Sequence, residues 1–188
     1  LAGLACARAL AERGIRFTLL EADDRLGGRV RTDNIDGYLL DRGFQVYLTA
    51  YPTAGELLDL DALELCPFPA GADVFFDGRF HRVADPRRAP LQAARLITSP
   101  LATVADVPKV LSLVRRWMRP DAPEREADRP AIDALREAGL SDHLIDRFLR
   151  PFFGGVFFDR DLATSARMLA FTFGNFARGR AAVPARGM

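Results

Sequence analysis

Residues 1–32 read LAGLACARALAERGIRFTLLEADDRLGGRVRT, and they contain the most specific motifs of the chain. Small and apolar side chains dominate residues 4–13, a composition typical of a helix that packs tightly against a sheet. Gly14 is placed to end that helix as a C-terminal cap. Residues 15–20 form an apolar run that ends at Glu21 and predicts a short strand. The order helix, glycine, strand, acid predicts the second half of a βαβ unit.

Gly3 lies where the N-terminus of this helix would meet a preceding strand. A missing side chain there lets backbone N–H groups and the positive end of the helix dipole approach a diphosphate. The dinucleotide fingerprint is G-x-G-x-x-G, followed about twenty residues later by an acid that binds ribose hydroxyls. Gly3 matches its last glycine and Glu21 matches the acid. We therefore expect a Rossmann-like domain in an α/β fold with its first strand missing, and an apolar strand followed by Gly-x-Gly upstream of Leu1.

A second signal follows the acid, where two adjacent glycines precede an arginine. Gly27 and Gly28 allow the loop to fold beneath phosphate groups. Arg29 offers a planar fork of donors to the phosphate oxygens. Charge and backbone freedom thus both predict a site for a diphosphate.

With these motifs, residues 1–49 resemble the flavin-dependent amine oxidase superfamily, which includes phytoene desaturases and protoporphyrinogen oxidases. Weaker similarity recurs at residues 148–158 and 182–188. The resemblance implies that FAD is the cofactor, that Glu21 holds the adenosine ribose, and that Gly43 approaches the flavin. It assigns no catalytic side chain. The expected cofactor-binding residues are Gly3, Glu21, Ala22, Arg25, Gly27, Gly28, Arg29, Thr32 and Gly43.

The remaining pattern predicts a second region of mixed α+β structure. We expect a partial FAD-binding domain over residues 1–50 and a substrate-binding region over residues 51–188, incomplete at its C-terminus. Residues 38–40 and 44–48 are expected to be extended, and Asp77-Gly78 predicts a hairpin over residues 74–83. Residues 90–117 and 130–148 are expected to be mostly helical, cut by prolines. Ser141 is expected to cap a helix, and Asp159 to cap another that starts at Leu162.

Composition limits the partners. The chain has 188 residues, of which 49% are hydrophobic, and its 26 basic and 25 acidic residues give a net charge of +1. This balance predicts no nucleic-acid partner.

We expect Cys6 and Cys66 to be buried thiols. His81 and His143 lack the spacing of metal ligands, so no metal site is expected. Without a long apolar run or a leader segment, a cytoplasmic location is expected.

Two clusters allow two interpretations each. Eight of the fourteen phenylalanines fall between residues 148 and 176, where they could wall a channel for a large apolar substrate or form ordinary core; we favour the core. Arginines along residues 87–119 could face anionic lipid as a peripheral membrane contact or form a solvated helix face; we favour the solvated face. The arginines along this stretch are Arg87, Arg88, Arg95, Arg115, Arg116 and Arg119, with Leu91, Leu96, Ile97, Leu111, Val114 and Trp117 between them. Lys109 is interpreted as an isolated exposed cation.

The resemblance implies an FAD-dependent oxidoreductase that takes a hydride from a carbon of a small organic substrate, either apolar or an amine. The cofactor would supply the difficult chemistry, and the protein would position the substrate. Three alternatives stay open: a flavin-containing isomerase or other non-redox flavoenzyme, an NAD-only dehydrogenase, and a non-catalytic truncated remnant. Because the first fingerprint glycines and the family's closing flavin motif are absent, we expect residues 1–188 alone to bind FAD poorly or not at all.

Overall fold

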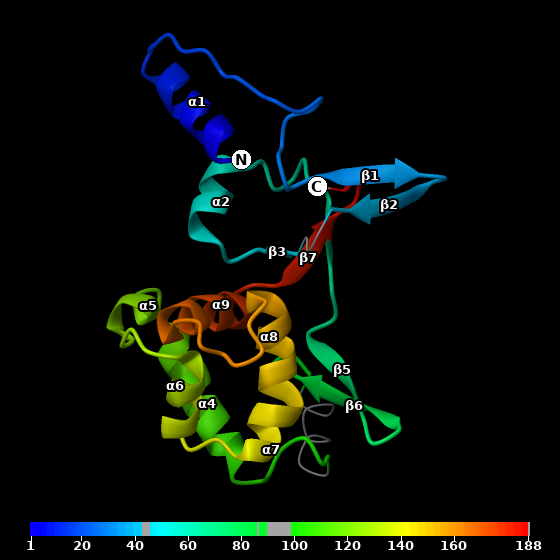
Figure 1. Ribbon diagram of the computed structural model, residues 1–188, viewed down its shortest axis with the longest axis vertical. Coiled ribbons are helices and arrows are strands. Elements are labelled where there is room, and N and C mark those ends of the chain that lie inside the picture. Colours follow the sequence, from blue (N-terminus) through cyan, green and yellow to red (C-terminus); the bar gives the residue numbers. More distant parts are fainter. Residues whose placement is uncertain (43–45, 86, 90–98, 188) are drawn as a thin grey trace. The chain divides into compact units, whose positions relative to one another are not determined.

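The computed structural model describes residues 1–42, 46–85, 87–89 and 99–187 (Figure 1). The chain forms two compact units. Unit 1 contains residues 1–68 and 181–188, and unit 2 contains residues 69–180. Small antiparallel sheets and short helices make up both units.

The first helix, α1 (Ala2–Glu12), confirms the predicted helix and its end. Gly14 has a φ of 67°, and its N–H donates to the carbonyl of Ala11 at 2.9 Å. No residue of α1 is buried, however, so the expected tight packing against a sheet is not observed.

The predicted strand over residues 15–20 is wrong for this structure. These residues have no regular secondary structure, and Leu20 is 87% exposed. A strand exists only when its N–H and C=O groups pair with a neighbour, and all pairing among the described strands is antiparallel and lies elsewhere. The described ranges therefore contain no parallel Rossmann sheet, and the observed architecture is mixed α/β.

Unit 1 contains two antiparallel sheets. Strands β1 (Thr32–Ile35) and β2 (Tyr38–Asp41) form a hairpin. In the second sheet, β7 (Ala181–Pro184) lies between β3 (Tyr47–Leu48) and β4 (Leu65–Pro67). Helix α2 (Pro52–Leu57) connects β3 to β4 along the chain. The end of the chain thereby becomes the central strand beside residues that precede it by more than a hundred positions.

The extended segments predicted for unit 1 are confirmed at β2 and at β3, whereas residues 43–45 lie outside the described ranges. Cys6 and Cys66 are both exposed, which corrects their expected burial. Cys6 is exposed because α1 buries none of its residues, and Cys66 lies on β4, at the edge of the three-stranded sheet.

Unit 2 begins with the predicted hairpin. Strands β5 (Gly71–Phe76) and β6 (Arg79–Ala84) pair along their full length, with Phe76 opposite Arg79. Asp77 and Gly78 make the turn with φ values of 51° and 72°. Two positive φ angles match the right-handed twist of the strands, and asparagine, aspartate and glycine tolerate them best.

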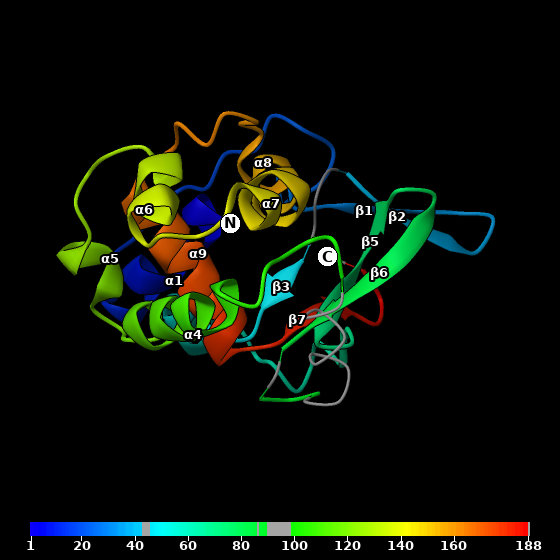
Figure 2. The ribbon, with the colours of Figure 1, turned by 90° about the horizontal axis from the view of Figure 1, so that it is seen from below.

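From Asp106 to Arg178 unit 2 is mostly helical, and Figure 2 shows its helices grouped together. They are α4 (Asp106–Trp117), α5 (Ala122–Arg125), α6 (Ala131–Glu137), α7 (Asp142–Leu144), the π-helical turn η2 (Ile145–Leu149), α8 (Arg150–Phe157) and α9 (Ala166–Arg178). Trp117, Phe153 and Leu169 are among the buried residues at their centre. Phe148, Phe152, Phe157 and Phe173 pack against this core, so the core interpretation is confirmed for these rings.

The predicted helix cap at Ser141 is confirmed, and the predicted cap at Asp159 is wrong. Ser141 caps α7 as predicted, because its Oγ accepts from the N–H of Leu144 at 3.3 Å. Helix α9 begins at Ala166 with Ser165 as its cap, so the expected start at Leu162 is wrong. The carboxylate of Asp159 instead accepts from the N–H of Thr164 at 2.7 Å and organises the preceding loop.

Basic side chains of unit 2 bond to neighbouring backbone and carboxylate groups. Arg87 donates to the carbonyl of Ala177 at 2.7 Å, and Arg88 to that of Gly179 at 2.6 Å. These two hydrogen bonds satisfy backbone carbonyl groups at the C-terminal end of α9. Lys109 donates to the carbonyl of Gly139, which corrects its interpretation as an isolated cation. Within the described ranges, no helix combines the length and apolar character needed to cross a membrane.

Candidate functional site

The predicted site starts at the first turn of α1. A Cβ atom built on Gly3 would lie 3.4 Å from Cδ1 of Leu19, so the segment after α1 returns to the N-terminal end of the helix. Leu1 stands at the N-cap position, where its side chain offers no acceptor, and the first turn carries no acidic residue. The positive end of the helix is thus free of a local side-chain counter-charge. Glu21 follows two residues after Leu19.

Residues 21–31, which we call the acid–glycine loop, begin with a series of local hydrogen bonds. Oε1 of Glu21 accepts from the N–H of Asp23 at 3.0 Å. Oδ1 of Asp23 accepts from the N–H of Asp24 at 2.8 Å. Since a carboxylate has two oxygens with several acceptor positions, Glu21 keeps capacity for a ribose hydroxyl.

Arg31 closes this loop. Its Nη1 donates to Oδ2 of Asp23 at 3.0 Å, and its Nη2 donates to Oδ1 of Asp24 at 2.7 Å. Hydrogen bonding from Asp24 and the positive charge of Arg31 together hold the pKa of Asp23 below its ordinary value. The loop is therefore tied at both ends, although its acids are exposed.

The two glycines of the loop lie in conformations that side chains oppose. Gly27 has a φ of 118°, and a Cβ on it would lie 2.8 Å from the carbonyl oxygen of Val30. Gly28 has a φ of 61°, and no atom lies within 4 Å of where its Cβ would be. The turn closes through Val30, whose N–H donates to the carbonyl of Gly27 at 3.3 Å. The backbone at Gly28 is thus bare and open to a close approach.

Arg25 contacts the β1–β2 hairpin, whose first residue is Thr32. Nη2 of Arg25 donates to Oδ1 of Asp33 at 3.4 Å, and Arg42 donates to the same carboxylate through Nε at 2.6 Å. The hydrogen bond from Arg42 is the main cause that lowers the pKa of Asp33. The hydroxyl of Thr32 donates to the carboxylate of Asp41. The contact of Arg25 with Asp33 therefore holds the acid–glycine loop to the hairpin, whereas the contact of Thr32 with Asp41 lies within the hairpin.

The structure brings together only part of the predicted set. Gly3 and the segment leading to Glu21 are neighbours, and residues 21–32 form one connected loop. Ala22 and Arg29 are exposed within that loop. Gly43 lies outside the described ranges. That Gly3 and the Gly27-Gly28-Arg29 segment face one groove stays a prediction.

The residues present fit the ribose and diphosphate part of a dinucleotide. Glu21 supplies an acceptor for hydroxyls, Gly28 supplies open backbone, and Arg25 and Arg29 supply guanidinium groups for phosphate oxygens. A Cβ at Gly27 would collide with the turn, so the loop could not keep this shape with another residue there. FAD is therefore compatible with this loop through its adenosine diphosphate portion.

Sequence reasoning gave no role to Arg31, although it lies two positions after Arg29. The sequence feature that could have indicated a role for Arg31 is an arginine that follows three closely spaced acids across a glycine turn. The sequence analysis also missed two buried carboxylates of unit 2. Asp106 accepts hydrogen bonds from Thr103 and Ser141, and Glu126 accepts from Nε1 of Trp117 at 2.9 Å.

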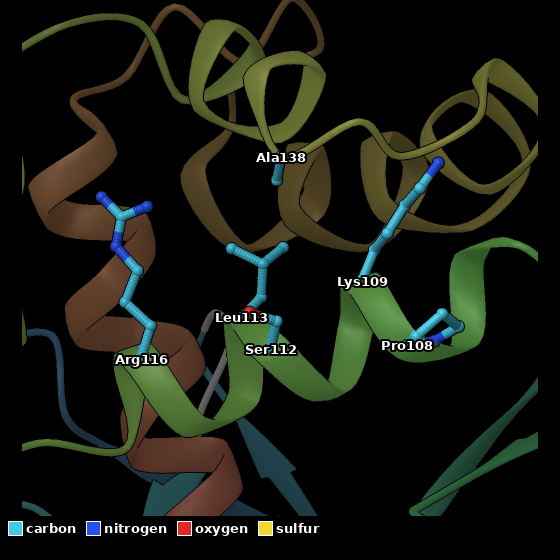
Figure 3. Close-up of a pocket in the computed structure, with 6 residues that line it drawn as sticks. All are labelled: Pro108, Lys109, Ser112, Leu113, Arg116 and Ala138. Carbon is cyan, nitrogen blue, oxygen red and sulfur yellow. The ribbon is translucent and has the colours of Figure 1, made fainter.

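A pocket of about 330 Å³ lies between α4 and the end of α6 (Figure 3). Leu113 and Ala138 form its apolar part, and Lys109 and Arg116 flank them. Both basic groups already have partners, because Lys109 bonds to Gly139 and Arg116 bonds to Glu126. Pro108 and Ser112 complete the lining, which includes no member of the predicted cofactor set. In the described part of the chain, no three His, Cys, Asp or Glu groups are arranged to hold a metal ion.

Comparison with known proteins identifies one family over the whole chain. The family model "Flavin containing amine oxidoreductase" matches residues 1–188. Protoporphyrinogen oxidase 2, chloroplastic/mitochondrial, of Arabidopsis thaliana is 27% identical over 156 residues, or 82% of this chain and 30% of that protein. Coproporphyrinogen III oxidase of Propionibacterium freudenreichii subsp. freudenreichii is 29% identical over 165 residues, again 82% of this chain and 30% of that protein.

A shorter match has a higher identity. Polyamine oxidase 5 of Oryza sativa subsp. japonica is 51% identical over 43 residues, which are 23% of this chain and 9% of that protein. No solved structure matches significantly. The chain thus spans about a third of the length of the two porphyrinogen-oxidising relatives.

Proposed function

Because the chain belongs to the flavin-containing amine oxidoreductase family, we propose that it is part of an FAD-dependent oxidoreductase and contributes the site for the adenosine diphosphate portion of the cofactor. The family accounts for the flavin and for oxidation of organic substrates in general. Beyond these family properties, we propose that the residues of the acid–glycine loop bind FAD and that the flavin takes a hydride from a carbon of the substrate.

One observation carries the proposal: the acid–glycine loop combines an acceptor at Glu21 with bare backbone at Gly27 and Gly28. The two positive φ angles alone do not distinguish this loop, because the hairpin turn at Asp77-Gly78 has them as well. The conformation at Gly28 leaves open space where a side chain would stand. Open backbone beside guanidinium groups favours an anion, and the acid at Glu21 favours an adjacent sugar.

Each residue of the loop has a distinct expected role. Glu21 accepts hydrogen bonds from ribose hydroxyls, as the acid of dinucleotide sites does. The backbone at Gly28 and the guanidinium of Arg29 bind the diphosphate oxygens. The first turn of α1, beside Gly3, adds the positive end of the helix dipole. The bound flavin would supply hydride acceptance, which amino-acid side chains do not provide.

The substrate class is proposed from the relatives' names. Two of them are named as oxidases of porphyrinogens and one as an oxidase of polyamines. We propose a small-molecule organic substrate with an oxidisable carbon, either an apolar ring system or an amine. Unit 2 is the part of the chain that follows the acid–glycine loop and the hairpin, and we propose that it contributes to substrate binding.

The test is cofactor content followed by anaerobic reduction. Purified protein with its natural flanking sequence is expected to be yellow, to release FAD on denaturation, and to take up added FAD after removal of the bound cofactor. A porphyrinogen and a polyamine are then added without oxygen. Lasting loss of the flavin absorbance with either compound supports oxidation of that substrate class.

Two results would count against the proposal. Protein that contains no flavin and takes up none would favour a non-catalytic remnant. Turnover of a substrate with the flavin spectrum unchanged at its end would favour an isomerase.

A G28V variant provides the site-specific comparison, because a branched side chain at a φ of 61° is strained and fills the open space. It is expected to lose FAD, whereas G55A on α2, where no atom lies within 4 Å of the added Cβ, is expected to retain it.

A further inference from the structure

Arg31 differs from the other charged residues of the acid–glycine loop in its burial. Its side chain is 7% exposed, whereas the side chains of Asp23 and Asp24 are 57% and 67% exposed. An arginine is seldom buried unless it is paired. Here the acids lie at the surface and converge on a buried cation, so Arg31 is the fixed member of the group.

The contacts of Arg31 extend through the loop to Glu21. Nη1 binds Oδ2 of Asp23, while Oδ1 of the same carboxylate accepts from the N–H of Asp24. The N–H of Asp23 donates in turn to Oε1 of Glu21. A connected path therefore runs from the guanidinium to the carboxylate that is proposed to hold the ribose.

The same contacts close the loop at its base. Asp23 and Asp24 lie eight and seven positions before Arg31, and between them are Gly27, Gly28 and Arg29. Glycine-containing segments have many accessible conformations, so holding one of them has an entropic cost. Two charge-assisted hydrogen bonds to a buried arginine reduce that freedom before any ligand binds.

Stability alone does not explain this arrangement. In the described part of the chain, the buried Nε of Arg31 has no hydrogen-bond partner. A buried donor without an acceptor is destabilising, because it loses its hydrogen bond to water without gaining another. Three carboxylates within four positions also repel one another. A loop selected only for stability would replace such a group, whereas a preorganised binding loop has a reason to keep it.

We propose that Arg31 is a positioning residue of the cofactor site: its guanidinium draws Asp23 and Asp24 together, orients Glu21 through the N–H of Asp23, and presets the Gly27-Gly28-Arg29 backbone for a diphosphate. This inference rests on the proposed FAD function. Lysine cannot replace it fully, because an ammonium group is a point charge without the planar fork that reaches two carboxylates at once.

The test compares FAD affinity in four forms of the protein by quenching of FAD fluorescence on titration of the apoprotein. R31M is expected to weaken binding about tenfold or more, the size of effect that loss of an orienting partner has at metal sites. R31K is expected to fall between R31M and the wild type. R82M is the matched control, because Arg82 makes a comparable two-bond pair with Asp73 on the β5–β6 hairpin; it should bind FAD as the wild type does.

A double-mutant cycle separates positioning from direct contact. If Arg31 acts through the two aspartates, R31M should add little in a D23N/D24N background, since coupled residues are not additive. Equal weakening by R31M in both backgrounds would overturn the positioning role in favour of direct binding to FAD. Should R31M fail to fold, R31K in the same two backgrounds carries the comparison.

Hydrogen exchange of the apoprotein gives a readout that needs no cofactor. Backbone amides of residues 22–30 are expected to exchange faster in R31M than in the wild type or R82M. Unchanged exchange, or unchanged FAD affinity in R31M, would overturn this inference while leaving the proposed function intact. Wild-type protein that binds no FAD would instead contradict the proposed function itself.

Discussion

At the scale of single residues, Gly174 on α9 shows how packing can reverse a helix propensity. Alanine is ordinarily about 1 kcal/mol more favourable than glycine inside a helix. A Cβ at Gly174, however, would lie 2.3 Å from the carbonyl oxygen of Trp117 on α4. Either the two helices must separate or the buried Trp117 must move. We expect G174A to destabilise unit 2 by about 1–3 kcal/mol, measured as a lower midpoint in thermal or urea unfolding.

Gly155 on α8 is the matched control for this prediction. It is also a helical glycine, but no atom lies within 4 Å of the added Cβ, and the residue is exposed. Ordinary propensity should therefore apply, and G155A is expected to stabilise the protein by about 0.5–1 kcal/mol. Equal effects of the two substitutions would contradict the close approach of α9 to α4.

At the scale of elements, Asp106 joins the start of α4 to the start of α7. The side chain is buried, at 1% exposed. Its Oδ2 accepts from the N–H of Thr103 at 2.7 Å, and its Oδ1 from the N–H of Ser141 at 2.7 Å. In D106N, the side-chain NH2 group would replace one carboxylate oxygen and face one of these two N–H groups. Two donors cannot bond to each other, so one buried hydrogen bond would be lost. We expect a loss of about 2 kcal/mol or more in the free energy of unfolding.

The pH dependence of this loss has a definite sign. Burial raises the pKa of Asp106, but hydrogen bonds from Ser141 and Thr103 outweigh burial and leave the pKa below its ordinary value. A carboxyl group with a lowered pKa in the folded state stabilises it above the unfolded-state pKa, at about pH 4, and loses that effect as the pH falls through the folded-state value. The stability difference between wild type and D106N should therefore be constant near neutral pH and shrink in acid.

An exposed aspartate provides the comparison for Asp106. Asp146 pairs with Arg150 one helical turn later at 3.0 Å, and D146N is expected to change stability by about 0.5 kcal/mol or less. A D106N variant that matched D146N at pH 7 would show that the link between α4 and α7 adds little.

Elements differed in how well the sequence predicted them, and the difference follows the range of the contacts they need. The end of α1 at Gly14 and the turn at Asp77-Gly78 depend on local backbone conformation, and both were predicted. The run over residues 15–20 has strand composition but no neighbour to pair with in the described ranges. Strand β7 pairs with residues more than a hundred positions away, and no local pattern specifies such a partner.

The candidate site divides in the same way. The conformations of Gly27 and Gly28 follow from residue type, so the bare backbone of the loop could be predicted. The role of Arg31 could not, because it depends on which acids the turn brings to the guanidinium. Burial of that side chain depends on packing that its own sequence neighbours do not reveal.

At the scale of the whole molecule, the two units should respond differently to a nucleotide. ADP carries the ribose and the diphosphate that the acid–glycine loop is proposed to bind, but it carries no flavin. We therefore expect ADP to compete with FAD and to slow hydrogen exchange over residues 2–32, since a ligand stabilises the conformation that binds it. Residues 106–178, which form a core within unit 2, should keep the same exchange rates.

FAD tested in the same experiment extends the argument beyond the loop. If the flavin reaches residues that the adenosine portion does not, FAD should protect every segment that ADP protects and additional segments as well. AMP provides the control for the diphosphate, because it retains the ribose and lacks the second phosphate. Protection by AMP equal to that by ADP would mean that Gly28 and Arg29 do not bind the diphosphate. Protection by ADP that spread evenly over both units would contradict a site for adenosine diphosphate within unit 1.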